Sequence, residues 1–183
     1  LDGKVELEIR DLAQAIPYKL SFMLMDACFM GGIETAYEVK GSVDYYIGSP
    51  AEILTESFPY HKIMQHIFKS TPDYAAVCKE YYDYYNAKSG AERSATVALM
   101  DCSKLAEVAE VAKRVFDQYG ESIASLDLSL LQPYFRGSSS KYFYDLKDLV
   151  DAIADASLSA EFAAALERAV PYKAATPYFI ELP

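Results

Sequence analysis

The chain has 183 residues, of which 52% are hydrophobic, and this supplies enough apolar material for one sizeable core. Its 17 basic and 27 acidic residues leave a net charge of −10, which disfavours nucleic acid and anionic membranes as partners and favours cationic ones. Its apolar runs are far shorter than the roughly 20 residues of a membrane-spanning helix, so we expect no membrane span. The three cysteines show no paired spacing, so neither a disulfide framework nor a metal site is predicted.

The first part of the chain predicts a surface helix, followed by a strand, a helix and a second strand. Apolar residues at helical spacing predict a surface helix over residues 5–16. Residues 20–25 form a nearly continuous apolar run of the kind that a parallel sheet buries on both faces, so we expect a central strand there. Gly31–Gly32 then breaks the chain. A helix is expected over residues 33–40 and a strand parallel to the first over residues 43–47.

The rest of the chain continues to alternate helices and strands. We expect helices over residues 59–68, 72–86, 103–119, 146–156 and 160–169, strands over 94–101 and 178–182, and an exposed loop over Gly137–Ser140. The predicted fold class is therefore α/β, a three-layer sandwich with a mainly parallel sheet. Because this sheet is thin for so apolar a chain, we expect an N-terminal segment absent from the chain to complete it.

Cys28 lies just after the carboxyl end of the expected central strand, where open α/β sheets place their chemistry. The helix expected from residue 33 begins shortly after it, and its N-terminal amides would stabilise a thiolate. The alternative is a small buried hydrophobic residue, which is what most isolated cysteines are. Cys78 and Cys102, with no histidine beside them, are interpreted as structural. Position alone leaves both interpretations of Cys28 open.

The residues around Cys28 resemble a known family. Met25–Glu38, which reads MDACFMGGIETAYE, is similar to the nucleophile segment of clostripain-type cysteine peptidases. In that segment an apolar strand leads into Asp-Ala-Cys, an apolar pair, glycine and a Glu-containing helix. The resemblance continues into Tyr46–Glu52 and more weakly into Tyr144–Leu149. It implies a caspase-like fold in which residues 1–183 form the C-terminal, heavy-chain part of a single peptidase domain.

The resemblance further implies a cysteine endopeptidase that cleaves peptide bonds after Arg or Lys. Cys28 would be the nucleophile of a Cys-His dyad, and water would release an acyl-enzyme. In the family the histidine precedes the cysteine, whereas here the two histidines, His61 and His66, follow it. They lie about 140° apart on a predicted helix, so we interpret them as packing or solvent-facing residues rather than a metal pair. We expect an upstream N-terminal light chain to supply the catalytic His and the missing strands, with Leu1 as a processing site.

A pocket for a basic side chain needs a carboxylate, because an unpaired buried guanidinium or ammonium is very costly. Asp26 is the first candidate, since it matches the family's Asp two residues before the nucleophile and points to the same side of an extended chain as Cys28. Glu52 and Glu56, in the loop after the next strand, are candidates for a second acid. The alternatives are ordinary solvated glutamates and a structural Asp26 that holds loop amides.

Two other classes of function stay open from these residues. One is a catalytically inactive homologue that only binds peptides or partner proteins. The other is another cysteine acyl-transfer enzyme, of glutaminase type, which would need a downstream His near an acid. The family resemblance also implies a bacterial protein that is secreted, periplasmic or on the cell surface. No cofactor is expected; calcium dependence is known for some relatives, but no loop here shows spaced acidic ligands.

Overall fold

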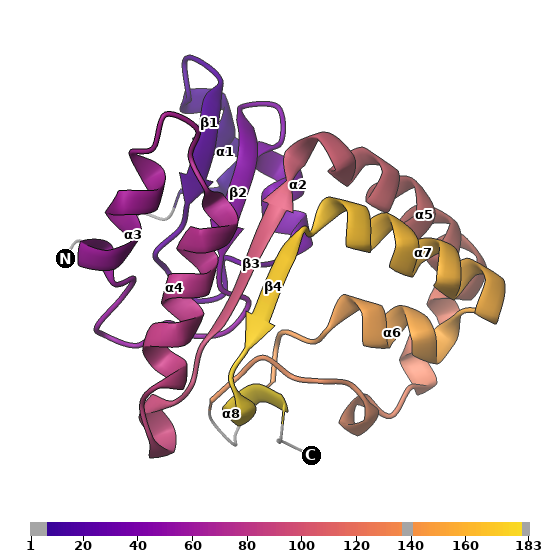
Figure 1. The fold of residues 1–183 in the computed structure, drawn as a ribbon. Helices are drawn as coiled ribbons and strands as arrows, with labels where there is room; N and C mark the ends of the chain where they lie inside the picture. The colour runs from indigo at the N-terminus through magenta and orange to yellow at the C-terminus, as the bar shows by residue number, and fades with distance from the viewer. Residues whose placement is uncertain (1–6, 137–140, 181–183) are drawn as a thin grey trace.

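The computed structural model of the chain describes residues 7–136 and 141–180. In these residues a four-stranded sheet has helices on both faces (Figure 1). The strands, in their order across the sheet, are β1 (Leu20–Leu24), β2 (Val43–Gly48), β3 (Thr96–Asp101) and β4 (Tyr172–Ala175). The α-helices are α1 (Ile9–Ala15), α2 (Ile33–Val39), α3 (Tyr60–Ile67), α4 (Tyr74–Asn86), α5 (Leu105–Tyr119), α6 (Leu146–Ile153), α7 (Ala156–Ala169) and α8 (Pro177–Ile180). Short 3₁₀ turns occur at Gly90–Glu92, Cys102–Lys104, Gly120–Ser125 and Leu128–Leu130.

β1, α2 and β2 form the parallel strand, helix and strand that the sequence predicts. Leu24 of β1 pairs with Ile47 of β2 in parallel register. α2 crosses between them and buries Ala36 and Val39 in the core. This unit positions the Cys28 loop, because the loop is the connection between β1 and α2.

The sheet is mixed in the described residues, whereas the sequence predicted a mainly parallel one. Only β1 and β2 run parallel there, and β3 runs antiparallel to both β2 and β4. The reason is that α3 and α4 pack against each other as a pair, which returns the chain to the end of β2 that it left. Gly48, the last residue of β2, accordingly pairs with Ala98 near the start of β3. A strand that starts where its neighbour ends must run the other way.

β1 lies at the edge of the described sheet, although the sequence predicted a central strand. None of its five residues is buried. The apolar side chains of Phe22 and Met23 stay partly exposed, in contrast to β3, where every residue from Thr96 to Met100 is buried. The apolar character of β1 is therefore greater than its observed burial explains.

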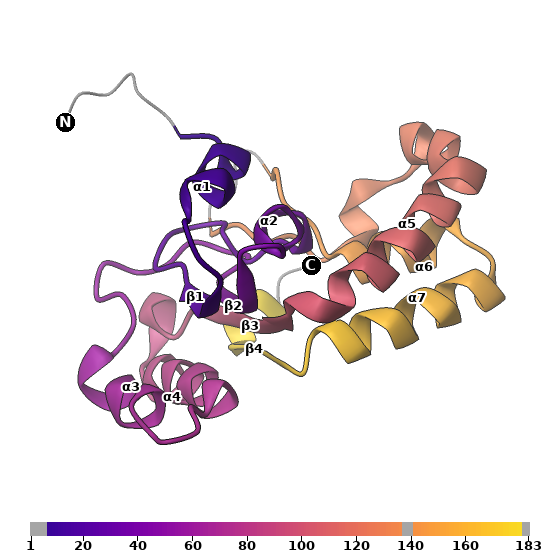
Figure 2. The same cartoon turned by 90° about the horizontal axis from the view of Figure 1, so that it is seen from above.

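The two faces of β3 build separate cores. Ala98 and Met100 pack with α2, α5 and α7, while Val97 and Leu99 pack with α3 and α4. Figure 2 shows α3 and α4 together on one side of the sheet, away from α2, α5 and α7. The predicted three-layer α/β sandwich is confirmed.

The end of the chain differs from the prediction of a strand over residues 178–182. Residues 177–180 form the short helix α8, and the last strand is β4, which the sequence did not predict. Pro177 favours a helix start because its φ is preset and its missing amide hydrogen is not needed there. Residues 181–182 and the predicted loop over Gly137–Ser140 lie outside the described residues.

Candidate active site

Cys28 lies in the loop between β1 and α2 and is exposed. Three backbone amides of this loop donate to carbonyls of the neighbouring segment: Met25 to Ile47 (2.9 Å), Phe29 to Ala51 (3.1 Å) and Gly31 to Ser49 (2.8 Å). Phe29, directly after Cys28, has a φ of 62°, in the left-handed region that few non-glycine residues adopt. A tightly tethered loop thus presents an exposed thiol.

The sulfur of Cys28 contacts the backbone of Ile53. The Ile53 amide donates to Sγ at 3.3 Å, and the Ile53 carbonyl oxygen lies 3.8 Å from Sγ. The amide faces the sulfur as a donor, and the carbonyl faces it as an acceptor for the thiol hydrogen. The sequence predicted that the start of α2 would supply such amides. Within the described residues, however, Ile53 provides the only hydrogen-bonding groups on this sulfur.

Two glycines allow the Cys28 loop to touch the end of β2. A Cβ atom on Gly48 would lie 2.5 Å from the carbonyl oxygen of Met30. A Cβ atom on Gly31 would overlap the backbone of Ser49 and Pro50. Since no side chain fits at either position, glycine is needed for this close approach. The sequence marked Gly31 only as a break in the chain.

Asp26 has one satisfied and one unsatisfied carboxylate oxygen. Oδ2 accepts hydrogen bonds from the hydroxyls of Ser57 and Tyr60, the latter at 2.8 Å. Oδ1 is buried and has no hydrogen-bond partner among the described residues. Burial, and after it the hydrogen bond to Asp26, raises the pKa of Tyr60 to about 12, so this phenol stays a donor at neutral pH. An unpartnered buried carboxylate oxygen is costly, and a ligand's N–H group would relieve that cost.

Glu52 and Glu56, the other predicted acids, have partners of their own. Both carboxylate oxygens of Glu52 accept from the backbone amide of Arg136 at 3.1 Å. The exposed carboxylate of Glu56 pairs with Lys88 and accepts from the Tyr84 hydroxyl. The hydrogen bond from Lys88, followed by that from Tyr84, lowers the pKa of Glu56. In contrast to Asp26, neither glutamate has a buried oxygen without a partner among the described residues.

The two histidines of the chain lie on α3 and bond elsewhere. His66 Nε2 lies 3.4 Å from a carboxylate oxygen of Glu80 on α4. His61 packs edge-on against Tyr84, with the ring centroids 6.4 Å apart. Neither imidazole hydrogen-bonds to the Cys28 sulfur. These positions agree with the interpretation of both histidines as packing or solvent-facing residues.

Cys78 and Cys102 are buried, in contrast to Cys28. Burial raises the pKa of the Cys78 thiol to about 12 and is the main cause that raises that of Cys102 to about 11. Both thiols are therefore neutral at physiological pH and unreactive. Their burial agrees with their interpretation as structural residues.

Arg136 is a residue of this region that the sequence did not predict. Its side chain is only 17% exposed. The guanidinium donates to the carbonyl of Glu52 at 2.9 Å, to the carbonyl of Ser94 at 2.6 Å and to the Ser94 hydroxyl. It also lies 5.5 Å from the ring centroid of Phe179. No motif marks this arginine, which is far from Cys28 in the sequence.

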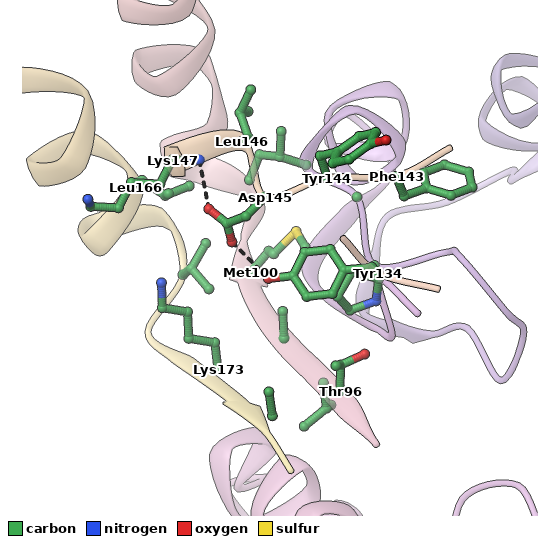
Figure 3. A pocket seen from close by; sticks show the side chains of 18 of the residues that line it. Thr96, Met100, Tyr134, Phe143, Tyr144, Asp145, Leu146, Lys147, Leu166 and Lys173 are labelled. Atoms are coloured by element: carbon green, nitrogen blue, oxygen red, sulfur yellow. Dashed lines mark hydrogen bonds between the residues drawn. The ribbon is translucent and has the colours of Figure 1, made fainter. Parts of the chain in front are cut away.

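A separate cavity of about 650 Å³ lies between β3, β4, α7 and residues 142–147. Figure 3 shows Asp145 between Tyr134, whose hydroxyl donates to it at 2.7 Å, and Lys147, whose backbone amide donates at 2.9 Å. The cavity adjoins the Cys28 loop at Gly31 but is lined by none of the four predicted site residues. It is therefore distinct from the candidate active site.

Residues 7–136 and 141–180 contain no group of three or more His, Cys, Asp or Glu side chains arranged to hold a metal ion. Nor does any helix in the described part of the chain combine the length and apolar character that a bilayer crossing requires.

Comparison with known proteins identifies a family. The model of the Clostripain family matches residues 1–174. Among curated proteins, we found no significant match. Solved structures, in contrast, include several similar proteins.

One is a clostripain from Bacteroides thetaiotaomicron in complex with the peptide inhibitor BTN-VLTK-AOMK; it is 33% identical, with a TM-score of 0.84, over 96% of this chain and 78% of that one. A second is an inactive zymogen C11 protease from Parabacteroides distasonis, 36% identical with a TM-score of 0.83, over 93% of this chain and 49% of that one. A third is a secreted C11 cysteine protease from B. thetaiotaomicron named iotapain, 33% identical with a TM-score of 0.82, over 92% of this chain and 48% of that one. The chain thus spans about half the length of the second and third proteins.

These matches confirm the family resemblance and the caspase-like α/β fold that the sequence predicted. They also argue against the glutaminase-type alternative, because the similar proteins are proteases. The chain belongs to the clostripain family of cysteine proteases.

Proposed function

We propose that this chain carries the nucleophile and the specificity pocket of a cysteine endopeptidase that cleaves peptide bonds after Arg or Lys. The observation that carries the proposal is the buried, unpartnered Oδ1 of Asp26, two residues before the exposed Cys28. One residue offers an acceptor for a basic side chain, and the other offers a thiol for the adjacent peptide bond.

Cys28 is the proposed nucleophile. Its thiolate attacks the carbonyl carbon of the scissile bond, and the C–N bond breaks as the amine leaves with a proton from a general acid. A water molecule then attacks the thioester and releases the acid product and the thiolate. The Ile53 amide at 3.3 Å from Sγ supports this role, because a donor at this distance interacts with the sulfur that attacks in the first step and leaves in the second. The proposed reaction uses no metal or cofactor, so EDTA should leave its rate unchanged.

Asp26 is the proposed acid of the pocket. Ser57 and Tyr60 hold Oδ2, which orients the carboxylate and leaves Oδ1 without a partner. A guanidinium or ammonium group would satisfy that oxygen with a charge-assisted hydrogen bond, which a neutral side chain does not provide. The inhibitor peptide bound to the similar B. thetaiotaomicron clostripain, VLTK, ends in lysine. Because Glu52 and Glu56 are already paired, we assign the main electrostatic contribution to Asp26.

We further propose that the general base is a histidine from an upstream segment of the same precursor. Neither His61 nor His66 hydrogen-bonds to Cys28. The outer edge of β1 is open in the described sheet, and its apolar side chains are only partly covered. A further strand paired with β1 would cover them, and the loop after a parallel strand would end beside Cys28. A companion chain with a histidine, found by mass spectrometry of the active protein, is the expected result.

The location proposed for this protein is outside the cytoplasm of a bacterium. The similar structures come from Bacteroides and Parabacteroides, and iotapain is described as secreted. Detection of the protein in culture medium or in the periplasmic fraction would test this.

The proposed specificity is tested with fluorogenic peptides that end in Arg, Lys or Asp, incubated with the protein and any segment encoded upstream of it. We expect cleavage after Arg and Lys but not after Asp, and no cleavage by Cys28→Ala. Asp26→Asn should lower kcat/KM for Arg and Lys peptides roughly 100-fold, because a charged hydrogen bond is lost in a buried pocket. Asp44→Asn, which removes an exposed acid paired with Lys19, is the matched control and should change little.

Four results would contradict the proposal. Cleavage after Asp would exclude the assigned specificity. Activity that survives Cys28→Ala would exclude the assigned nucleophile. Unchanged kinetics in Asp26→Asn would exclude this residue from the pocket. A folded protein that cleaves none of the peptides but still binds them would favour an inactive peptide-binding homologue.

A further inference from the structure

One peptide group connects Arg136 to the sulfur of Cys28. The carbonyl of Glu52 and the amide of Ile53 belong to the same peptide group. The Arg136 guanidinium donates to that carbonyl oxygen at 2.9 Å. The Ile53 amide, at the other end of the group, donates to Cys28 Sγ at 3.3 Å. A fixed positive charge and the candidate nucleophile therefore lie at opposite ends of one peptide dipole.

The Arg136 side chain is held firmly in this position. Besides the Glu52 carbonyl, its guanidinium donates to the carbonyl of Ser94 at 2.6 Å and to the Ser94 hydroxyl. The ring of Phe179 lies under it, 5.5 Å from the guanidinium carbon. Most of the side chain is buried, so water competes little with the guanidinium for these acceptor oxygens. One terminal nitrogen, Nη2, donates to both carbonyls, while Nη1 donates to the Ser94 hydroxyl. The planar fork of arginine thus holds three acceptors with two nitrogens, whereas lysine has a single nitrogen.

The backbone of Arg136 is tied to the same segment. Its amide donates to both carboxylate oxygens of Glu52 at 3.1 Å, and its carbonyl accepts from the Tyr178 hydroxyl at 3.0 Å. Glu52 is thus bound to Arg136 through its side chain as well as through its carbonyl. The carboxylate of Glu52, a candidate for the pocket in the sequence, is therefore already engaged by the Arg136 backbone.

We propose that Arg136 is a positioning residue for the Cys28 nucleophile. Its bond to the Glu52 carbonyl fixes the plane of the Glu52–Ile53 peptide, so that the Ile53 amide points at the sulfur. The same bond polarises the peptide and strengthens the Ile53 N–H as a donor. Both effects reach the sulfur through this peptide group, without any contact between Arg136 and the sulfur or the substrate. The proposal rests on the proposed function, in which Cys28 is the nucleophile.

The test compares Arg136→Gln and Arg136→Lys with Arg93→Gln. Arg93 is the matched control, since it is also partly buried and donates to the Asn86 side chain at 2.8 and 3.0 Å, with no link to Cys28. The first measurement is the rate of Cys28 alkylation by iodoacetamide, followed by mass spectrometry. It requires neither substrate nor catalytic histidine, and Cys28→Ala gives the background. The second measurement separates kcat from KM for Arg and Lys peptides.

We expect Arg136→Gln to slow alkylation roughly three- to tenfold, as for a weakened charged hydrogen bond. Arg136→Lys should slow it less, and Arg93→Gln should leave it unchanged. In cleavage assays kcat should fall in Arg136→Gln while KM stays the same, because the Asp26 pocket is intact. If Arg136→Gln does not fold, the alkylation rate of the lysine variant decides the question.

Alkylation of folded Arg136→Gln at the rate of the unsubstituted protein would overturn the proposal. So would equal slowing by Arg93→Gln, which would show a general loosening of the fold. A rise in KM with unchanged kcat and alkylation would place Arg136 in substrate binding instead. Absence of all peptide cleavage would contradict the proposed function but not this inference, because the alkylation rates still report on the Arg136 link.

Discussion

Gly48→Ala tests whether the close approach between β2 and the Cys28 loop is needed. The new Cβ would lie 2.5 Å from the Met30 carbonyl oxygen and 2.9 Å from its carbon. A relaxed contact between carbon and a carbonyl oxygen is about 3.3 Å, so the overlap is roughly 0.8 Å. The obstacle is backbone rather than a flexible side chain. The carbonyl is also held in place, because the Tyr46 hydroxyl donates to the same oxygen at 2.7 Å.

Two opposing effects decide the size of the change. Replacing glycine by alanine in a strand lowers the entropy of the unfolded chain and is worth about 0.5–1 kcal/mol in favour of folding. Overpacking in a tight site costs about 1–3 kcal/mol. The two effects together span a net loss in the free energy of unfolding of about 0–2.5 kcal/mol, and because the obstacle is backbone we expect the upper half of that range. The displaced Met30 backbone should also slow alkylation of Cys28.

The assay is urea unfolding followed by circular dichroism, together with the alkylation rate of Cys28. Gly41→Ala is the matched control, because a Cβ there would meet no atom within 4 Å. It should change the free energy of unfolding by less than about 1 kcal/mol, and any change should be an increase. If Gly48→Ala were as stable and as reactive as Gly41→Ala, the idea that these backbones must touch would be refuted.

Three further predictions concern the stability of the fold. Phe162→Ala should lower the free energy of unfolding by about 3–5 kcal/mol in urea titrations, because this α7 side chain is fully buried, and a loss below about 1 kcal/mol would contradict it. Asp155→Ala should cost about 1 kcal/mol, visible as a lower Tm, since this carboxylate caps α7 by accepting from the amides of Ser157 and Leu158; an unchanged Tm would show that the cap is not needed. Burial raises the pKa of Cys78 from 9.0 to about 12, so the stability that its neutral thiol contributes is present below about pH 9 and is lost as the pH rises toward 12. Urea midpoints at rising pH should therefore fall less steeply in Cys78→Ala, and identical slopes would refute this assignment.

Much of the fold was predictable because its signals are local. The apolar run that ends at Met25, the Gly31–Gly32 break and the short helix after it are neighbours in the sequence. The run and the helix each have a hydrophobic pattern that can be recognised within a few residues. β4 was missed because Tyr172–Ala175 is short and contains a lysine and two alanines, which are poor strand signals. The antiparallel direction of β3 was missed because it depends on α3 and α4 packing as a pair.

The candidate site also combines residues that a local motif contains with residues that only the fold brings together. Asp26 and Cys28 are two residues apart, so a sequence motif contains both. Ser57, in the loop before α3, and Tyr60, the first residue of α3, hold Asp26 from more than 30 positions away, and nothing local in the sequence connects them to it. Glu52 and Glu56 were candidates because of their loop, but hydrogen bonding within the fold gives each a different partner.

The sequence by itself thus determined the α/β class, the unit of β1, α2 and β2, the family and the cysteine that its motif contains. Periodicity and short motifs encode these properties within a few residues. Only the tertiary structure decided which carboxylate oxygen is left unpartnered and which amide reaches the sulfur. It also revealed the link from Arg136 through the Glu52–Ile53 peptide to Cys28. These depend on atoms from distant segments meeting within about 3 Å, and that distance is set by how the whole chain packs.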